Sequence, residues 1–347
     1  MSDWFKDNIK HLKYKGNKLE DIFTQQQLED LYHLDGNAQA LRVVGKLHDL
    51  HNESGMNLTK SLLNILVKYP VKSTEIDKDS DDIKYHKLGY YASDFDMFDD
   101  IARTTGTKLS DDEYVRHPLT YLLEAADDIA YATADIEDGL KKNYISVQDF
   151  INIFEQIVDE TDEKNYPLLQ SLKEQIKNDS QNELQIMQEW LDNVRDWLEY
   201  NAVYSFTSNY NVIMKGNYAK ELLNGVYNEN ILKVLKAVAN EYLFANKEIN
   251  KVELSGSVIL EFLLSKFVGA ILEYDEDDIK VTKENKKIIG LLSQNHLNVY
   301  NREKEKCTTE GDKVYLKLHL VIDYISGMTD SYAKRLCQEL RGVTFFE

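Results

Sequence analysis

The sequence predicts an all-α fold, and three observations carry this prediction. The 347 residues include only three prolines and fifteen glycines, so few positions interrupt helices. Apolar side chains recur at intervals of three and four residues in several segments, and no convincing run alternates between apolar and polar side chains. The 22 tyrosines and 12 phenylalanines are typical of a globular chain, which at this length can bury a large core.

The expected elements follow in order along the chain. Residues 1–30 are charged and weakly patterned, and they predict no element. A helix over 57–70 should begin at an N-cap, either Asn57 or Thr59, and end at Pro70. The other expected elements are a helix within 37–50, an acidic loop at 73–84, a short helix within 90–106, a long helix opened by Pro118, a core-facing helix around 184–198, and helices near 217–247, 253–273 and 314–340.

Composition narrows the function and the location. Lys and Arg number 41 against 60 Asp and Glu, a net charge of −19, and such a surface repels nucleic-acid phosphates and anionic membranes. Two cysteines, Cys307 and Cys337, form neither a disulfide framework nor a zinc site by themselves. No signal peptide and no run of 18 apolar residues is recognisable. We therefore expect a cytoplasmic protein that binds no membrane and no nucleic acid.

The stretch "EAADDIAYATADIEDG", from Glu124 to Gly139, holds six carboxylates, and no Lys or Arg lies between Arg116 and Lys141. Like charges four residues apart on a helix cost a few tenths of a kcal/mol each. The stretch is therefore either a solvated helix face or a candidate site for metal binding or phosphate chemistry. A divalent cation would offset the repulsion, and so would a cationic residue from elsewhere in the fold. A helical wheel places the apolar residues Leu122, Ala125, Ile129, Ala132, Ile136 and Leu140 on one side and Glu124, Asp127, Tyr131, Ala134, Asp135 and Asp138 on the other.

Six ordered stretches resemble one known family. "RHPLTYLLEAADDIAYATADIEDGL" resembles the last metal-ligand helix of bacterial deoxyguanosine triphosphate triphosphohydrolases, which belong to the HD-domain superfamily. The resemblance implies an HD-domain-like helical bundle with a C-terminal helical extension. It places a partial catalytic core in residues 1–150 and a helical region packed on it in 151–347, together forming one globular unit. The other matching stretches are "LDGNAQALRVVGKL", "NLTKSLLNILVKYP", "KLGYYASDFDMFDDI", "NAVYSFTSNYNVIMKG" and "VIDYISGMTDSYA".

The resemblance assigns roles to three residues of the acidic helix. Asp127 resembles the final carboxylate ligand of a divalent metal, Mg²⁺ or Mn²⁺. Tyr131 resembles the tyrosine that packs on the deoxyribose and leaves no room for a 2′-hydroxyl. Asp135 resembles the acceptor for the sugar 3′-hydroxyl.

Three further residues are implied as substrate contacts. Lys68 and Tyr69 in "VKYP" resemble triphosphate and substrate contacts, and a lysine suits that role as a mobile positive charge. Asn37 in "GNAQ" resembles another polar residue of the active site. The alternatives are that Lys68 and Tyr69 are helix C-cap and surface residues, and that Asn37 is an N-cap.

The family also holds its metal through an early histidine and a His-Asp dipeptide, and further His and Glu residues act in catalysis. By the resemblance, these lie before a segment like "SDWFKDN", so we expect an N-terminally truncated chain with no identified catalytic residue and a weakly held cation. His48-Asp49, with His51 nearby, lies downstream of "GNAQ" and is interpreted as a chance dipeptide. The remaining histidines, His11, His33, His86, His117, His296 and His319, have no context typical of a ligand.

The family cleaves a deoxynucleoside triphosphate (dNTP) to the deoxynucleoside and inorganic triphosphate, which is the function implied here. The alternative is a non-catalytic remnant that binds nucleotide or assembles with and regulates an intact enzyme. Little or no hydrolysis is expected from the chain alone. The implied partners are a dNTP and either further copies of the chain or a complementing N-terminal segment.

Overall fold

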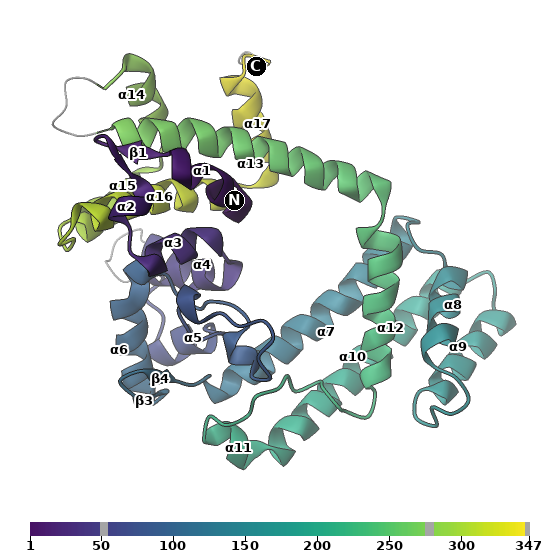
Figure 1. Cartoon of the computed structure of the whole chain (residues 1–347). Coiled ribbons are helices and arrows are strands. Elements are labelled where there is room, and N and C mark those ends of the chain that lie inside the picture. Colours follow the sequence, from purple (N-terminus) through teal and green to yellow (C-terminus); the bar gives the residue numbers. More distant parts are fainter. Residues whose placement is uncertain (49–54, 275–280, 344–347) are drawn as a thin grey trace. The chain divides into compact units, whose positions relative to one another are not determined.

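The computed structural model describes residues 1–48, 55–274 and 281–343, and almost all of its elements are helices (Figure 1). This confirms the all-α prediction. Within the described residues, strands occur only as two short antiparallel hairpins, β1 (Lys13–Tyr14) with β2 (Asn17–Lys18) and β3 (Lys108–Ser110) with β4 (Glu113–Tyr114). Strands of two or three residues are too short to show an alternating pattern, so the sequence did not predict them.

The chain forms two compact units. Unit 1 combines Met1–Arg116 with Leu254–Glu347, and unit 2 is His117–Glu253. The boundary predicted at residue 150 coincides with neither junction, and that division of the chain remains a prediction.

The helices of each unit are as follows. Unit 1 contains α1 (Ser2–Asn8), α2 (Leu19–Ile22), α3 (Gln25–Tyr32), α4 (Gly36–Arg42), the π-helix η2 (Val43–Leu47), α5 (Lys60–Ile65), α6 (Phe95–Thr105), α14 (Lys283–Ile289), α15 (Gln294–Lys304), α16 (Glu310–Ser326), α17 (Asp330–Leu340) and the 3₁₀ turns η1 (Ile9–His11), η3 (Ser73–Glu75), η4 (Ile83–Tyr85) and η5 (Ala92–Asp94). Unit 2 contains α7 (Pro118–Lys141), α8 (Val147–Ile157), α9 (Tyr166–Asn178), α10 (Glu183–Ser208), α11 (Tyr210–Met214), α12 (Glu229–Val238) and the π-helix η6 (Ala239–Phe244). The junction between Glu253 and Leu254 lies within α13 (Lys247–Glu273).

Local signals placed some helix ends correctly and others wrongly. Pro118 does open α7, and the His117 side chain caps it by accepting a hydrogen bond from Leu119 N (3.2 Å). Thr59 caps α5, whereas Asn57 has a φ of 54° and is not the cap. The helix expected to reach Pro70 ends at Ile65.

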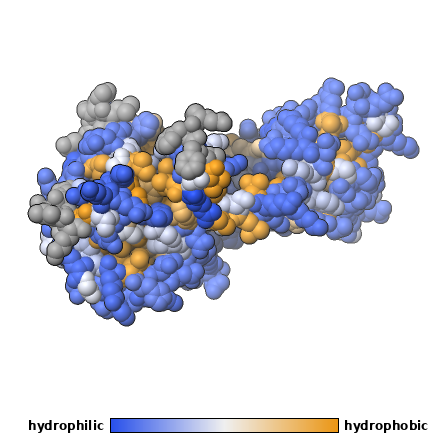
Figure 2. Space-filling view, turned by 90° about the horizontal axis from the view of Figure 1, so that it is seen from above, coloured by the Kyte–Doolittle hydropathy of each residue, from blue (hydrophilic) through white to orange (hydrophobic). Residues whose placement is uncertain are grey.

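α13 is both long and apolar. By length and composition alone it could cross a membrane, although a core helix of a soluble protein passes the same test. Its C-terminal half, including Leu263, Phe267 and Ile271, belongs to a hydrophobic core of unit 1 that also contains side chains of α1 and α16. Hydrophobic patches interrupt the mostly hydrophilic surface seen from above (Figure 2).

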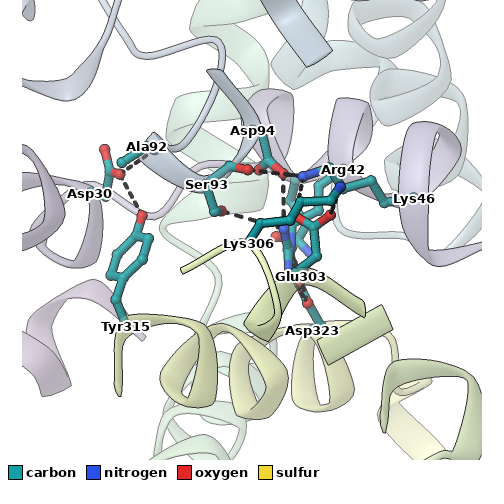
Figure 3. A network of polar contacts seen from close by, with 11 residues as sticks. Asp30, Arg42, Lys46, Ala92, Ser93, Asp94, Glu303, Lys306, Tyr315 and Asp323 are labelled. Atoms are coloured by element: carbon teal, nitrogen blue, oxygen red, sulfur yellow. Dashed lines mark hydrogen bonds and ion pairs between the residues drawn. The ribbon is translucent and has the colours of Figure 1, made fainter. Parts of the chain in front are cut away.

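A buried network of charged side chains joins distant segments of unit 1 (Figure 3). Arg42, at the end of α4, forms two hydrogen bonds with Asp323 of α16, from Nε to Oδ1 and from Nη2 to Oδ2, both 2.8 Å. Its Nη1 donates to Asp94 Oδ1 at 2.9 Å. Lys46 of η2 lies 2.8 Å from Asp94 and 2.7 Å from Glu303 of α15. Arg42, Asp94 and Asp323 are each at most 3% exposed, so these charges depend on one another for solvation.

The electrostatics of Asp94 reflect this pairing. Burial is the largest influence on the pKa of Asp94 and raises it, but Lys46 and Arg42 together bring the pKa down to about 2. Asp94 is therefore ionised at neutral pH, and the network contains a fixed negative charge at this position.

Asp30 of α3 is a buried carboxyl whose pKa is raised, in contrast to that of Asp94. Its Oδ2 accepts hydrogen bonds from Tyr315 Oη (2.5 Å) and Ala92 N (2.7 Å). Burial is the largest influence and raises the pKa of Asp30 to about 6, although hydrogen bonds from Ser73, Tyr315 and Ala92 oppose it.

We expect replacement of Arg42 by Met to destabilise the protein by about 3 to 5 kcal/mol, because the buried carboxylates of Asp94 and Asp323 lose the guanidinium that they share. Urea unfolding measures this loss. Arg335→Met is the matched control, since Arg335 is 67% exposed and its pair with Glu339 should contribute at most about 1 kcal/mol. Equal, small losses in the two variants would contradict a stabilising role for the network.

Asp30→Asn tests the second carboxyl. A pKa raised in the folded state means that folding favours the protonated form, so the cost of burying ionised Asp30 appears as pH rises from about 4 and is complete above about 6. Relative to the wild type, the Asn variant should therefore gain about 3 kcal/mol between pH 4 and pH 7. Unfolding free energies measured across this range check the prediction, and a difference independent of pH would refute it.

Candidate functional site

One face of α7 carries three of the predicted site residues. Asp127, Tyr131 and Asp135 follow at intervals of four residues, so each lies about 6 Å further along the helix than the last. Asp127 is exposed, Tyr131 is 64% exposed and Asp135 is half-buried. Carboxylate, aromatic ring and carboxylate thus form one strip along the helix.

The rest of the acidic stretch has structural explanations. Glu137 is bonded by Lys141 (2.7 Å) and by Arg195 of α10 (3.0 Å), and these partners lower its pKa. Lys142 lies 3.7 Å from Asp138. Cations therefore offset the carboxylates near the C-terminal end of α7, and one of them comes from a helix distant in sequence.

The helical wheel was wrong for Glu124. It placed this residue on the exposed row, but Glu124 is only 7% exposed. The wheel assumes a buried stripe of constant width, whereas the first turns of α7 are buried on more sides, with Thr120 and Tyr121 also covered.

Asp135 has a distinct charge environment. Burial is the main cause that raises its pKa, and the nearby carboxylate of Asp138 raises it further. No cation is paired with Asp135 among the residues the structure describes. A hydrogen-bond donor from a ligand, such as a hydroxyl group, would find an acceptor there.

Asn37 lies in the first turn of α4 in unit 1. The N-cap is Asp35 and not Asn37, so the alternative role proposed for Asn37 was wrong. Asp35 Oδ1 accepts hydrogen bonds from both Asn37 N (2.8 Å) and Asn37 Nδ2 (2.7 Å). The half-buried Asn37 side chain is therefore held in one orientation.

Lys68 and Tyr69 lie beyond the end of α5. The C-cap of α5 is Leu66, so neither residue is the C-cap that the alternative interpretation expected, and both are half-buried. The Tyr69 carbonyl accepts a hydrogen bond from Val71 N (2.8 Å), and Val71 O accepts one from Gly89 N (3.1 Å). The backbone of Tyr69 is thus fixed by neighbours on two sides.

Residues 87–91, "KLGYY", contact both the cap of α4, where Asn37 lies, and the backbone at Tyr69. Lys87 Nζ lies 3.6 Å from Asp35 Oδ2, and Tyr91 Oη donates to Asp35 O at 3.2 Å. Gly89 lies so close to Tyr69 that a Cβ at this position would be 1.9 Å from the Tyr69 carbonyl oxygen. No role for this stretch was predicted from the sequence. Its glycine was the available signal, because a close backbone approach requires one.

The two groups of predicted residues belong to different units. Asn37, Lys68 and Tyr69 lie in unit 1, and Asp127, Tyr131 and Asp135 in unit 2.

The described residues do not fit a resident metal ion. Within 1–48, 55–274 and 281–343, no group of three or more His, Cys, Asp or Glu side chains could hold one. In the His48-Asp49 dipeptide, which was interpreted as a chance match, His48 is exposed. Asp49 and the nearby His51 lie outside the described residues.

Other histidines have structural surroundings. His319 is fully buried between the rings of Tyr91 and Tyr315, and burial lowers its pKa to about 4. His86 lies 2.9 Å from Ser80 O. These surroundings agree with the absence of a ligand context in the sequence.

Comparison with known proteins identifies the family. A protein of Listeria monocytogenes called deoxyguanosinetriphosphate triphosphohydrolase-like is 40% identical to 99% of this chain, which covers 73% of that relative. The chain belongs to the deoxyguanosinetriphosphate triphosphohydrolase-like family. A protein of Pseudomonas aeruginosa with the same name is 29% identical over 93% of this chain and 68% of its own length. The deoxyguanosinetriphosphate triphosphohydrolase of Yersinia enterocolitica is 28% identical over 94% of this chain and 67% of its own length. The model of the phosphohydrolase-associated domain matches residues 228–339.

Membership in this triphosphohydrolase-like family confirms the resemblance drawn from the six stretches. Three of those stretches meet in the buried network, since they contribute Arg42 and Lys46, Asp94, and Asp323. The family likeness therefore extends over residues that stabilise unit 1 as well as over those predicted to contact substrate.

We expect Gly89→Ala to destabilise the protein by about 1 to 3 kcal/mol, because the added methyl group forces the Tyr69 backbone to move. Gly269→Ala is the control, since no atom lies within 4 Å of a Cβ at this position of α13 and alanine there should add about 0.5 to 1 kcal/mol. Urea unfolding compares the two. An unchanged stability in Gly89→Ala would show that the segment yields freely and does not fix Tyr69.

Proposed function

We propose that this chain binds a deoxynucleoside triphosphate and acts in the release of inorganic triphosphate from it. The observation that carries the proposal is the strip of Asp127, Tyr131 and Asp135 on α7, in a chain 40% identical to a triphosphohydrolase-like relative. The predicted cytoplasmic location is part of this proposal.

Each side chain has a role that suits its chemistry. The exposed ring of Tyr131 packs on the deoxyribose and excludes a 2′-hydroxyl. Asp135 accepts a hydrogen bond from the 3′-hydroxyl. Lys68 attracts the triphosphate with a flexible positive charge, while Tyr69 and Asn37 make polar contacts from a fixed backbone.

The cation is the incomplete part of this proposal. Asp127 is proposed as one ligand of Mg²⁺ or Mn²⁺, but the described residues supply no set of three ligands. Stable binding of such ions needs several oxygen or nitrogen ligands in fixed geometry. We therefore derive no hydrolytic step through the cation, and we expect it to be held weakly.

A second candidate function is the alternative drawn from the sequence. In this alternative the chain binds the nucleotide without cleaving it and acts through assembly with an intact enzyme of the family. The two candidates share the nucleotide contacts and differ in turnover.

Asp127→Asn separates the two candidates. Triphosphate release from each of the four dNTPs, with Mn²⁺ and with Mg²⁺, is measured alongside equilibrium binding of the same nucleotides. Turnover that falls about 100-fold or more in Asp127→Asn would support the catalytic proposal. Binding without turnover would favour the second candidate, and neither binding nor turnover would reject both. Asp138→Asn is the control, since it removes an exposed carboxylate of the same helix.

Tyr131→Ala tests sugar recognition. Loss of the stacked ring should weaken dNTP binding about tenfold and reduce the preference for a dNTP over the ribonucleotide, because space for the 2′-hydroxyl opens. Competition binding with matched deoxy- and ribonucleotides measures both effects. Tyr227→Ala, at a 56% exposed tyrosine of unit 2, should change neither. An unaltered preference in Tyr131→Ala would remove Tyr131 from the site.

A further inference from the structure

The sequence contains a single Asn-Gly dipeptide, Asn224-Gly225, which lies in the turn before α12 of unit 2. An asparagine loses its side-chain amide most readily in front of glycine, because glycine has no side chain to hinder attack by its own backbone nitrogen. Every other asparagine of the chain is followed by a residue with a side chain. The dipeptide is therefore the position of this chain at which spontaneous reaction of an asparagine is favoured.

The surroundings of the dipeptide leave room for this reaction. Both residues are exposed, and Gly225 has a left-handed backbone with a φ of 73°. No atom of the described residues lies within 4 Å of the position that a Cβ of Gly225 would take. Asn224 N donates to Glu221 O at 3.3 Å, but no hydrogen bond to the Asn224 side chain occurs in the part of the chain that the structure describes. The side-chain amide can thus rotate toward the next backbone nitrogen.

A carboxylate is paired with the nitrogen that would react. Gly225 N donates a hydrogen bond to Oε2 of Glu229, the first residue of α12, at 3.1 Å. Lys233 Nζ lies 3.1 Å from Oε1 of the same carboxylate. The N–H bond lies in the plane of the peptide group, whereas an attacked carbon approaches from above or below this plane. The hydrogen bond therefore leaves that path open and places Glu229 where a base can take the proton.

We propose that Asn224 and Gly225 form a site of spontaneous chemical modification, in which Glu229 acts as the base. The Gly225 nitrogen forms a bond with Asn224 Cγ as its proton passes to Glu229. The bond from Cγ to Nδ2 breaks, and ammonia leaves with the proton that the carboxyl group returns. Water then opens the cyclic imide to aspartate or isoaspartate at position 224. The chain and one water molecule supply all the atoms, so no oxidant, reductant or metal takes part.

The product differs from the original chain in charge and in backbone length. Both products carry a carboxylate in place of a neutral amide, and isoaspartate also adds one carbon atom to the main chain. The change lies a few residues before α12, which packs against α7 and α8 within unit 2. The modification therefore alters the connection that leads into a packed helix.

Incubation of the full chain in warm, neutral buffer over several days tests the proposal. Intact mass and peptide mapping measure conversion at position 224, and enzymatic methylation detects isoaspartate. Asn224→Gln should show neither product. Glu229→Gln keeps a hydrogen-bond acceptor but removes the base, and it should slow conversion about tenfold or more. Lys233→Gln is the matched control, since it breaks the same exposed ion pair but keeps the carboxylate, and it should leave the rate within about twofold.

Concentrated urea provides an independent check, because the hydrogen bond between Gly225 and Glu229 exists only in the folded chain. The unfolded wild type and unfolded Glu229→Gln should react at the same rate. The proposal is overturned if position 224 remains asparagine in the wild type, or if folded Glu229→Gln reacts as fast as the wild type or faster. It is also overturned if Lys233→Gln slows the reaction equally, or if the effect of Glu229→Gln persists in urea.

Discussion

Unit 1 depends on a single buried arginine. Arg42 bonds Asp323 through two hydrogen bonds across 281 positions of the sequence, and it also holds Asp94. Charges with at most 3% exposure lose almost all contact with water, so any arrangement that separates them leaves a carboxylate or guanidinium unsolvated. Breaking these buried ion pairs costs more free energy than the intact pairs contribute to stability. The network thereby disfavours arrangements in which Arg42 of α4 is separated from Asp323 of α16.

The buried network and the candidate site residues of unit 1 share the same elements, α4 and the segment 87–91. α4 carries Asn37 in its first turn and Arg42 as its last residue, so the ion pairs that fix Arg42 also fix the helix that presents Asn37. The segment 87–91 contacts Asp35 and the backbone at Tyr69, and it leads within a few residues to Asp94. A change in the network should therefore reach the proposed contact residue Asn37 and the backbone at Tyr69 through short, packed connections.

How much the sequence could predict depended on the range of the interactions. Pro118 and Thr59 marked helix starts correctly because capping involves residues only a few positions apart. The wheel placed Tyr131 and Asp127 on an exposed face, but it could not foresee that Glu124 is buried, since burial depends on neighbours distant in sequence. The helices within residues 1–30 were missed because they are short, although Thr24 and Gln27 form a capping box there. The charged network had no local signal in the sequence, because its members lie up to 281 positions apart. The family resemblance included its segments but did not predict that they meet.

α7 shows how one helix can hold six carboxylates. Near its C-terminal end, Lys141, Lys142 and Arg195 offset the charges of Glu137 and Asp138. Near its N-terminal end, Glu124 is covered. Between these two regions lie Tyr131, the most exposed aromatic ring of the helix, and Asp135, a carboxyl whose pKa is raised by burial and by Asp138. Packing and ion pairs thus account for the two ends of the acidic stretch. Its middle turns have the accessibility and the hydrogen-bonding capacity that a bound deoxynucleotide would use, and they are where a functional role for the helix is best sought.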